Sequence, residues 1–98
     1  MLRHVVMMQL TAEATDQDAA AIVAGLESLP ALVPEIRSYS VGRDAGLAEG
    51  NFDIVVVGDF DDEAGFAAYG ANADHIAVIT ERIRPFMANR TAVQYIIE

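Results

Sequence analysis

The chain has 98 residues, of which 53% are hydrophobic, and its 15 acidic and 6 basic residues give a formal net charge of −9. Because this charge repels phosphate backbones and anionic lipid headgroups, we expect neither a nucleic acid nor a membrane surface as a partner. Cysteine is absent and the two histidines lie far apart in sequence, so disulfide staples and a metal site are not expected. We predict one small, soluble, cytoplasmic domain over residues 1–98 that uses no metal or other cofactor.

A domain of this size buries only ~60–65% of the surface that its unfolded chain exposes. Without disulfides or a metal, association with a second copy is the remaining source of buried surface. The high hydrophobic share of the composition favours the same interpretation.

The first half of the chain predicts three strands and one helix. Residues 2–10 form a nearly continuous apolar run, typical of a strand covered on both faces. Thr15 is a typical helix N-cap, and apolar residues then recur at helical spacing until Pro30. Two further strands are predicted over residues 36–42 and 52–60, joined by a polar hairpin loop with two glycines.

The second half predicts helices and a last strand. Asp61 is expected to cap a helix whose inner face carries Phe66 and Tyr69. Asp74 is expected to cap a further helical segment, which Pro85 weakens near its end. The last strand is predicted over residues 90–97.

The order strand–helix–strand–strand–helix–strand is that of the split βαβ, ferredoxin-like arrangement. We therefore predict an α+β protomer with a four-stranded antiparallel sheet and both helices on one sheet face. We expect the first and third strands to be parallel neighbours at the sheet centre. Since the strands are apolar on both faces, the uncovered face needs a cover, and a two-fold homodimer through the sheet faces provides it.

Several short motifs carry a family likeness. They are Arg3-His4-Val5-Val6, Val33-Pro34-Glu35-Ile36, Phe52-Asp53-Ile54-Val55, Tyr69 followed six residues later by His75, and Ile83-Arg84-Pro85. In this order and spacing they resemble the stress-responsive A/B barrel (Dabb) family. The resemblance implies a ferredoxin-like protomer that pairs through its sheet into a dimeric α/β barrel.

The resemblance also implies a site. The best understood members are similar to plant polyketide cyclases of the olivetolic acid cyclase kind, which close a ring without metal or organic cofactor. By this likeness His75 is the base, Tyr69 binds or positions the substrate, and His4 is a second pocket histidine. The chain departs from the cyclases at Asp53, where they carry a histidine, and at three positions where they carry bulky aromatics: Ile22, Val23 and Leu26.

Strand alternation suggests which side chains accompany these residues. His4, Val6 and Met8 share one face of the first strand, and Asp53, Val55 and Val57 share one face of the third. If both faces look toward the helices, these residues line one substrate pocket with the first-helix aliphatics. An aspartate beside His4 would hold one imidazole tautomer and raise its basicity.

Three functions remain open. The first is a cofactor-independent lyase or cyclase acting on a carbonyl, polyketide-like substrate. The second is a non-catalytic, stress-related binding or structural dimer. The third is a monooxygenase of the related dimeric α/β-barrel superfamily; it ranks last because those enzymes often rely on tryptophan or haem, and the chain has no tryptophan. The arginines Arg82, Arg84 and Arg90 are interpreted as surface residues that pair with acidic groups, with an acidic ligand as the alternative.

Overall fold

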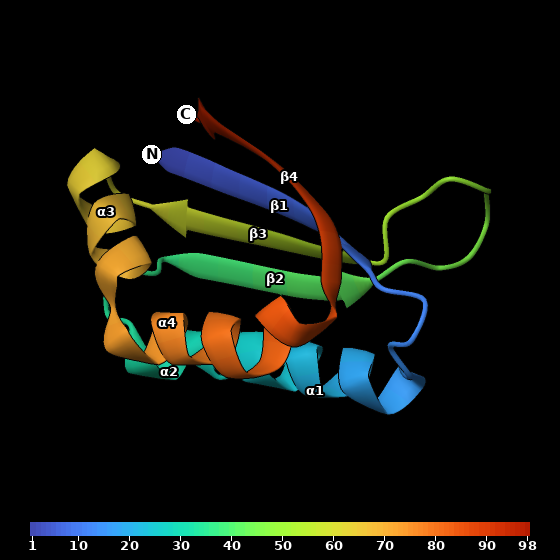
Figure 1. The fold of residues 1–98 in the computed structure, drawn as a ribbon. Coiled ribbons are helices and arrows are strands. Elements are labelled where there is room, and N and C mark those ends of the chain that lie inside the picture. Colours follow the sequence, from blue (N-terminus) through green and yellow to red (C-terminus); the bar gives the residue numbers. More distant parts are fainter.

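The computed structural model describes residues 1–98 as a four-stranded antiparallel sheet with the helices gathered on one side of it (Figure 1). The strands are β1 (Leu2–Leu10), β2 (Ser38–Arg43), β3 (Ile54–Phe60) and β4 (Met87–Ile96). The helices are α1 (Asp16–Glu27), α2 (Leu29–Leu32), α3 (Glu63–Ala71) and α4 (Ala73–Val78), and α4 continues into a π-helical turn (Ile79–Ile83) and a 3₁₀ turn (Arg84–Phe86). The strand order is β2-β3-β1-β4. The predicted ferredoxin-like α+β fold is confirmed.

The two central strands run in opposite directions, so the expectation of parallel neighbours is wrong. β1 pairs with β3 from Leu2 opposite Phe60 to Met8 opposite Ile54. Helix α1 returns the chain so that β2 runs in the direction of β1, and the β2–β3 hairpin then reverses it. β3 lies between β1 and β2 in the sheet and is antiparallel to both.

Side chains cap the starts of both α1 and α3. At α1 the Thr15 hydroxyl accepts the N–H of Asp18, and the Asp18 carboxylate accepts the N–H of Thr15, which makes a reciprocal capping box. The expectation for α3 is wrong by one residue, since Asp62 caps this helix. Asp61 instead pairs with the guanidinium of Arg37, whose nitrogens lie 3.0 and 3.1 Å from the carboxylate.

The last strand begins earlier than predicted. Pro85 lies in the 3₁₀ turn, which ends the helical segment, and β4 starts at Met87 rather than at Arg90. Two other strands, β2 and β3, start two residues later than predicted, at Ser38 and Ile54, and β1 starts at Leu2 as expected. The shifts affect only residues at the ends of the apolar runs, and they leave the order of the elements unchanged.

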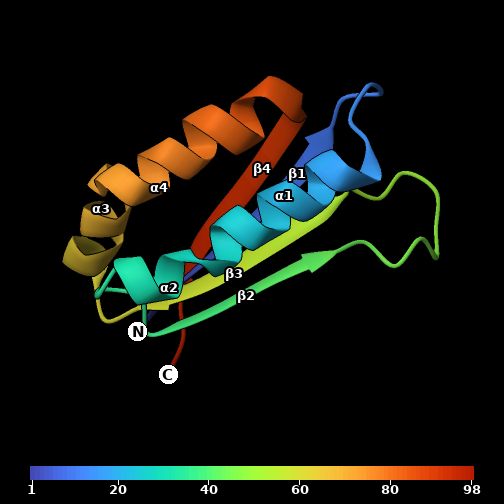
Figure 2. The same cartoon turned by 90° about the horizontal axis from the view of Figure 1, so that it is seen from below.

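The hydrophobic core lies between the sheet and the helices. Figure 2 shows α1 and α4 crossing the same face of the sheet. From β1 and β3 the core takes every second residue, and from α1 it takes one stripe, as the periods of strand and helix require. Its members include Val6, Met8, Ile22, Leu26, Leu29, Val33, Ile54, Val56, Phe60, Tyr69 and Ile83.

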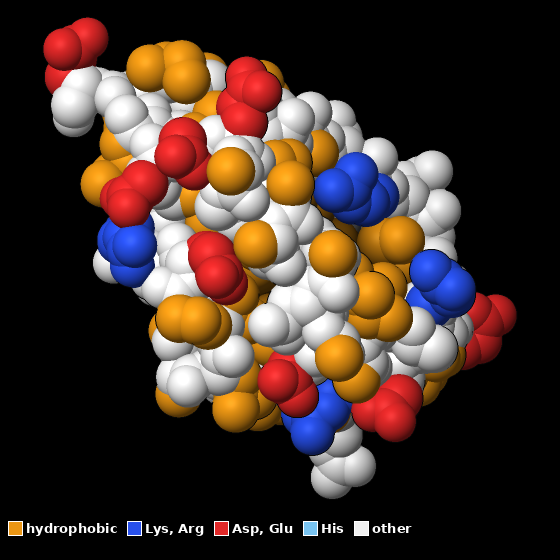
Figure 3. Space-filling view, turned by 90° about the vertical axis from the view of Figure 1, so that its left-hand side faces the viewer, with side chains coloured by type: hydrophobic (Ala, Val, Ile, Leu, Met, Phe, Trp, Pro, Cys, Tyr) orange, Lys and Arg blue, Asp and Glu red, His pale blue; other side chains and the backbone are white.

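The opposite face of the sheet carries apolar side chains that no helix covers. Val5 lies between Val57 of β3 and Val93 of β4, and Met7 lies beside Val55. The exposed fractions of Met7 and Val93 are 44% and 55%. At the end of the molecule with α3 and both termini, apolar side chains are interspersed with acidic ones (Figure 3). None of the helices has the length and hydropathy of a membrane span.

Candidate functional site

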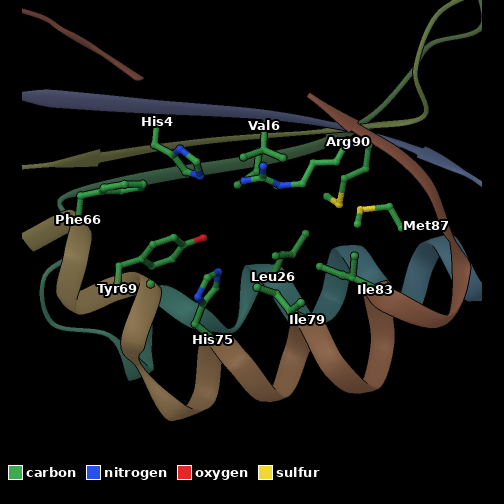
Figure 4. Close-up of a pocket in the computed structure, with 13 residues that line it drawn as sticks. His4, Val6, Leu26, Phe66, Tyr69, His75, Ile79, Ile83, Met87 and Arg90 are labelled. Atoms are coloured by element: carbon green, nitrogen blue, oxygen red, sulfur yellow. The ribbon is translucent and has the colours of Figure 1, made fainter. Parts of the chain in front are cut away.

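A cavity of about 220 Å³ lies between the sheet and the helical layer (Figure 4). Thirteen residues line it: His4, Val6, Met8, Leu26, Val56, Phe66, Tyr69, Gly70, His75, Ile79, Ile83, Met87 and Arg90. An apolar cavity of ~150 Å³ holds a benzene ring, whereas sites for drug-sized ligands span ~300–1,000 Å³. This cavity therefore has room for about one ring with a few substituents.

His4 enters the cavity from β1. Its side chain points from the sheet toward the helices (Figure 4), and the residue is only 4% exposed. The ring lies against Phe66, with centroids 4.8 Å apart. Burial, with the nearby charge of Arg90, lowers the pKa of His4 to about 4. The imidazole is therefore neutral at physiological pH.

The tautomer of His4 is set by its neighbour across the sheet. Gln94 of β4 stands directly opposite His4, and its Nε2 lies 2.8 Å from the histidine Nδ1. When the amide nitrogen donates to Nδ1, the ring proton resides on Nε2. This arrangement makes Nε2 a hydrogen-bond donor toward the cavity.

His75 is positioned by the start of α4. Asn72, and not the expected Asp74, is the N-cap: its Oδ1 accepts the N–H groups of Asp74 and His75 at 2.8 and 3.3 Å. The asparagine can take this role because it alone has the extended backbone that precedes the first turn. The cap thus holds the backbone from which the His75 ring rises toward the cavity (Figure 4).

The His75 ring is free of hydrogen bonds to the protein. Its Nδ1 is buried without a partner, and no side chain or carbonyl bonds its Nε2. Burial lowers the pKa of His75, while the nearby carbonyls of Tyr69 and Gly70 partly offset this effect without reaching hydrogen-bonding geometry. The ring is therefore a neutral imidazole with an unused lone pair.

Tyr69 stands beside His75. Their ring centroids are 4.0 Å apart, and Tyr69 is 3% exposed. Its hydroxyl lies 2.7 Å from the hydroxyl of Tyr39 on β2. Burial raises the pKa of both phenols, so both keep their protons. When the Tyr39 hydroxyl donates to that of Tyr69, the hydroxyl hydrogen of Tyr69 is left for a ligand in the cavity.

The structure brings six of the sequence-predicted site residues to this cavity: His4, Val6, Met8, Leu26, Tyr69 and His75. Two first-helix residues do not line it. Ile22 is fully buried in the core, and Val23 is half-buried against it. Ile22 shares its helix face with Leu26 but lies one turn earlier in α1, where it packs into the core, and of the three only Leu26 reaches the cavity.

Three predicted residues of the third strand lie elsewhere. The antiparallel register places Gly58, not Asp53, opposite His4, so the expected Asp53–His4 pair is wrong. Asp53 holds the far end of β1, where its carboxylate accepts the N–H of Leu10 at 2.8 Å. The two valines, Val55 and Val57, point to the uncovered sheet face, because alternation puts Ile54 and Val56 toward the helices.

Sequence reasoning missed Gln94 and Tyr39 as parts of the site. It interpreted Arg90 as a surface residue paired with acidic groups, which is wrong, because Arg90 lines the cavity and forms no ion pair. The signal for these residues is the register: once β4 is placed beside β1, Gln94 falls opposite His4 and Arg90 opposite Met8. No three histidine, cysteine, aspartate or glutamate side chains come together closely enough to hold a metal ion.

The comparisons with solved structures agree with this fold. A dimeric ferredoxin-like protein of unknown function from Thermobifida fusca is 38% identical, with a TM-score of 0.91 over 98% of this chain and 90% of that one. A hydroxynitrile lyase from Passiflora edulis is 20% identical, with a TM-score of 0.85 over 99% and 93%. A structure described as an antibiotic biosynthesis monooxygenase is 16% identical, with a TM-score of 0.79 over 100% and 99%.

At these identities the two enzymes show the fold alone. No functionally curated protein matches the chain. The model of the stress responsive A/B barrel domain, in contrast, matches residues 2–97, which is nearly the whole sequence. The chain therefore belongs to the stress responsive A/B barrel (Dabb) domain family.

Proposed function

We propose that the chain is a cofactor-independent lyase or cyclase that acts on a small carbonyl compound bound in the cavity. The observation that carries the proposal is the His75 ring, a neutral imidazole with no protein partner, at the edge of an apolar cavity. A histidine that served only to fill the core would satisfy its buried nitrogen within the protein. Because Nδ1 is enclosed by the protein, Nε2 is the ring nitrogen that suits a proton of a bound ligand.

The roles follow from the hydrogen-bonding groups. His75 takes a proton from the carbon next to the ligand's carbonyl group. The electron pair left behind moves onto the carbonyl oxygen, where Tyr69 and the Nε2–H of His4 donate hydrogen bonds to the new negative charge. In a cyclase step the enolate carbon then bonds to a second carbonyl carbon of the ligand, whose oxygen takes up the electron pair and then the proton of the His75 imidazolium. The same steps in reverse break that carbon–carbon bond, as a lyase does. General base catalysis of this kind contributes ~10²–10⁴-fold in rate.

The lowered pKa of His75 has two consequences for this step. It keeps the ring unprotonated at pH 7, and it makes the imidazolium a stronger acid once it forms. The unprotonated ring can accept a proton at once, and the more acidic imidazolium gives that proton up more easily. The existence of a hydroxynitrile lyase on the same fold supports lyase chemistry as the class of reaction.

We further propose that the protein works as a homodimer through its uncovered sheet faces in the cytoplasm. The exposed valines and Met7 support a partner there, and the 38% identical neighbour is dimeric.

A substrate of polyketide size is less favoured, because about 220 Å³ holds little more than one ring. A ketone or aldehyde of that size fits better.

A second candidate is a non-catalytic small-molecule or stress-related binding dimer. Its support is the small volume of the cavity, where Leu26 stands in place of a bulky aromatic. A monooxygenase remains third: the neighbour of that description supports it, whereas the lack of tryptophan speaks against the members that depend on one.

Proton abstraction can be tested without knowing the substrate. Acetophenone in D₂O exchanges its methyl protons when a base acts beside the carbonyl, and proton NMR follows the loss of signal. We expect the protein to accelerate this exchange, His75→Asn to remove at least ~100-fold of the acceleration, and Tyr69→Phe to remove ~10-fold.

The matched control is Asp74→Asn, which changes the neighbouring exposed side chain and leaves the ring in place. Exchange at the buffer rate, with acetophenone shown by chemical shifts to occupy the cavity, would favour the binding dimer. Equal rates for wild type and His75→Asn would remove His75 from the mechanism.

A further inference from the structure

We infer that the ligand of this cavity carries a carboxylate group, and that Arg90 binds it at the cavity mouth. This inference rests on the proposed function of the cavity as a small-molecule site and names the class of its ligand. It concerns a residue of β4 that stands apart from the histidines and the tyrosine assigned above.

Arg90 faces the cavity because of the sheet register. It lies directly opposite Met8 on β1, and residues opposite each other in neighbouring strands share a face of the sheet. Met8 is buried toward the helices, at 3% exposure. Figure 4 shows the arginine side chain running from β4 along the sheet, with its guanidinium ending beside Val6.

Arg90 has no partner of its own in the protein. Three of the six arginines form ion pairs with carboxylates: Arg3 with Asp59, Arg37 with Asp61 and Arg43 with Asp16. Arg82 donates to the carbonyl oxygen of Ala21 at 2.9 Å. Arg90 and Arg84 make neither kind of contact, and of these two only Arg90 lines the cavity. In a chain with 15 acidic side chains, Arg90 therefore keeps its guanidinium free of protein partners beside the cavity.

The cavity has the opposite charge to the protein around it. None of its 13 lining residues is acidic, and both of its histidines have a lowered pKa and are neutral at pH 7. Its formal charge is therefore that of Arg90 alone, within a chain of net charge −9. A cation beside an apolar cavity gains most from an anion that brings its own apolar body into the space.

The geometry favours a carboxylate over a phosphate. A guanidinium binds both in bidentate fashion, but a single positive charge balances a monoanion and leaves a phosphate dianion half unpaired. The volume of about 220 Å³ also leaves room for a planar group on a ring rather than for a bulky tetrahedral one. The apolar part would then lie against Leu26, Ile79 and Ile83, with Tyr69 and His75 beyond it.

The test compares two probes of equal size, benzoate and benzamide, by NMR titration of the methyl groups of Met8, Met87 and Ile83. We expect benzoate to bind wild-type protein ~10–100-fold more tightly than benzamide, as charge-assisted hydrogen bonds allow. In Arg90→Gln this preference should disappear, and in Arg90→Lys it should be reduced. Arg84→Gln, which loses the same charge outside the cavity, should keep the full preference.

The outcomes separate this inference from the function on which it rests. If benzamide binds as tightly as benzoate, the cavity is a ligand site without an anion preference, and the role of Arg90 is overturned while the proposed function stands. If neither probe shifts the cavity methyls, both are overturned. A preference that survives Arg90→Gln but is lost in Arg84→Gln would assign the anion to a different surface. Thermal unfolding of each variant verifies that it remains folded.

Discussion

At the scale of single residues, burial converts two ordinary histidines into neutral groups. His4 is enclosed between β1, β4 and Phe66. The free-energy cost of placing a positive charge there is not offset by the contact with Gln94. Arg90 acts in the same direction on both histidines, since a positive charge disfavours a second one nearby. The neutral state therefore comes from the fold and from one arginine together.

The neutral state of buried His4 makes the free energy of unfolding depend on pH within a defined range. Because the pKa of His4 is about 4 in the folded chain and 6.5 in the unfolded chain, the unfolded chain binds more protons between these values. The free energy of unfolding should therefore fall as the pH falls from 6.5 toward 4, with a slope of up to ~1.4 kcal/mol per pH unit from His4. NMR titration of the His4 ring protons should give a midpoint near 4.

The control for the titration is His4→Gln, which removes one histidine resonance and its share of the slope while His75 continues to titrate. A midpoint near 6.5 for His4 would contradict the burial argument. Arg90→Gln should raise the pKa of both histidines, since it removes a cation near each.

At the scale of elements, the start of α4 decides where His75 stands. The cap residue is Asn72, with Asp74 in the first turn, and the helix then widens into the π-helical turn that brings Ile79 and Ile83 to the cavity. Such turns inside helices are frequent at functional sites. Cap chemistry is visible in sequence as a group of polar residues, but which of them takes the extended backbone depends on how α3 ends.

Removing the Asn72 side chain should therefore lower the free energy of unfolding by more than removing that of Asp74. Asn72→Ala loses the oxygen that accepts two N–H groups, and we expect it to lower the free energy of unfolding by about 1 kcal/mol. Asn72→Asp keeps an acceptor and should retain most of the stability. Asp74→Ala should change it by less than ~0.5 kcal/mol. Urea denaturation measures all three, and a larger loss for Asp74→Ala than for Asn72→Ala would return the cap to Asp74.

At the scale of the whole molecule, the sheet has one covered and one uncovered apolar face. Val5, Met7 and Val93 form its exposed centre, next to the ion pair of Arg3 with Asp59 at 2.8 Å. An apolar surface of this extent on a chain of 98 residues is typical of an interface. The same face on a second copy is its simplest cover, because a two-fold axis pairs identical patches.

A charge in this face should separate the two copies. Val93→Glu places two like charges near the proposed two-fold interface, which costs several kcal/mol and should raise the dimer dissociation constant at least ~100-fold. The control is Ile76→Glu, whose parent side chain is similarly exposed, at 48%, but lies on α4. Sedimentation equilibrium measures both. A Val93→Glu protein that remains dimeric would place the interface elsewhere.

The strands and helices could be predicted because their signals are local. Apolar runs and the capping box at Thr15 each act within a few residues of chain. The expected helix end at Pro30 is wrong, since α1 ends at Glu27 and Pro30 lies in the first turn of α2, where a proline is tolerated. The lining of the cavity could be predicted only in part. His4, Tyr69 and His75 come together as expected from the family likeness, whereas Asp53 lies at the other end of the sheet.

What the sequence determined by itself is the order of elements, the fold class and the apolar second face, since side-chain periodicity encodes burial directly. What only the tertiary structure decided is strand direction and register, and through them the partners of each polar group. Gln94 lies beside His4 although 90 positions of chain separate them, and Arg90 lies opposite Met8 across 82 positions. Both pairings are set by how β4 runs along β1. These pairings cannot be predicted from local sequence, because the strand register is fixed only when the whole sheet packs on the common core.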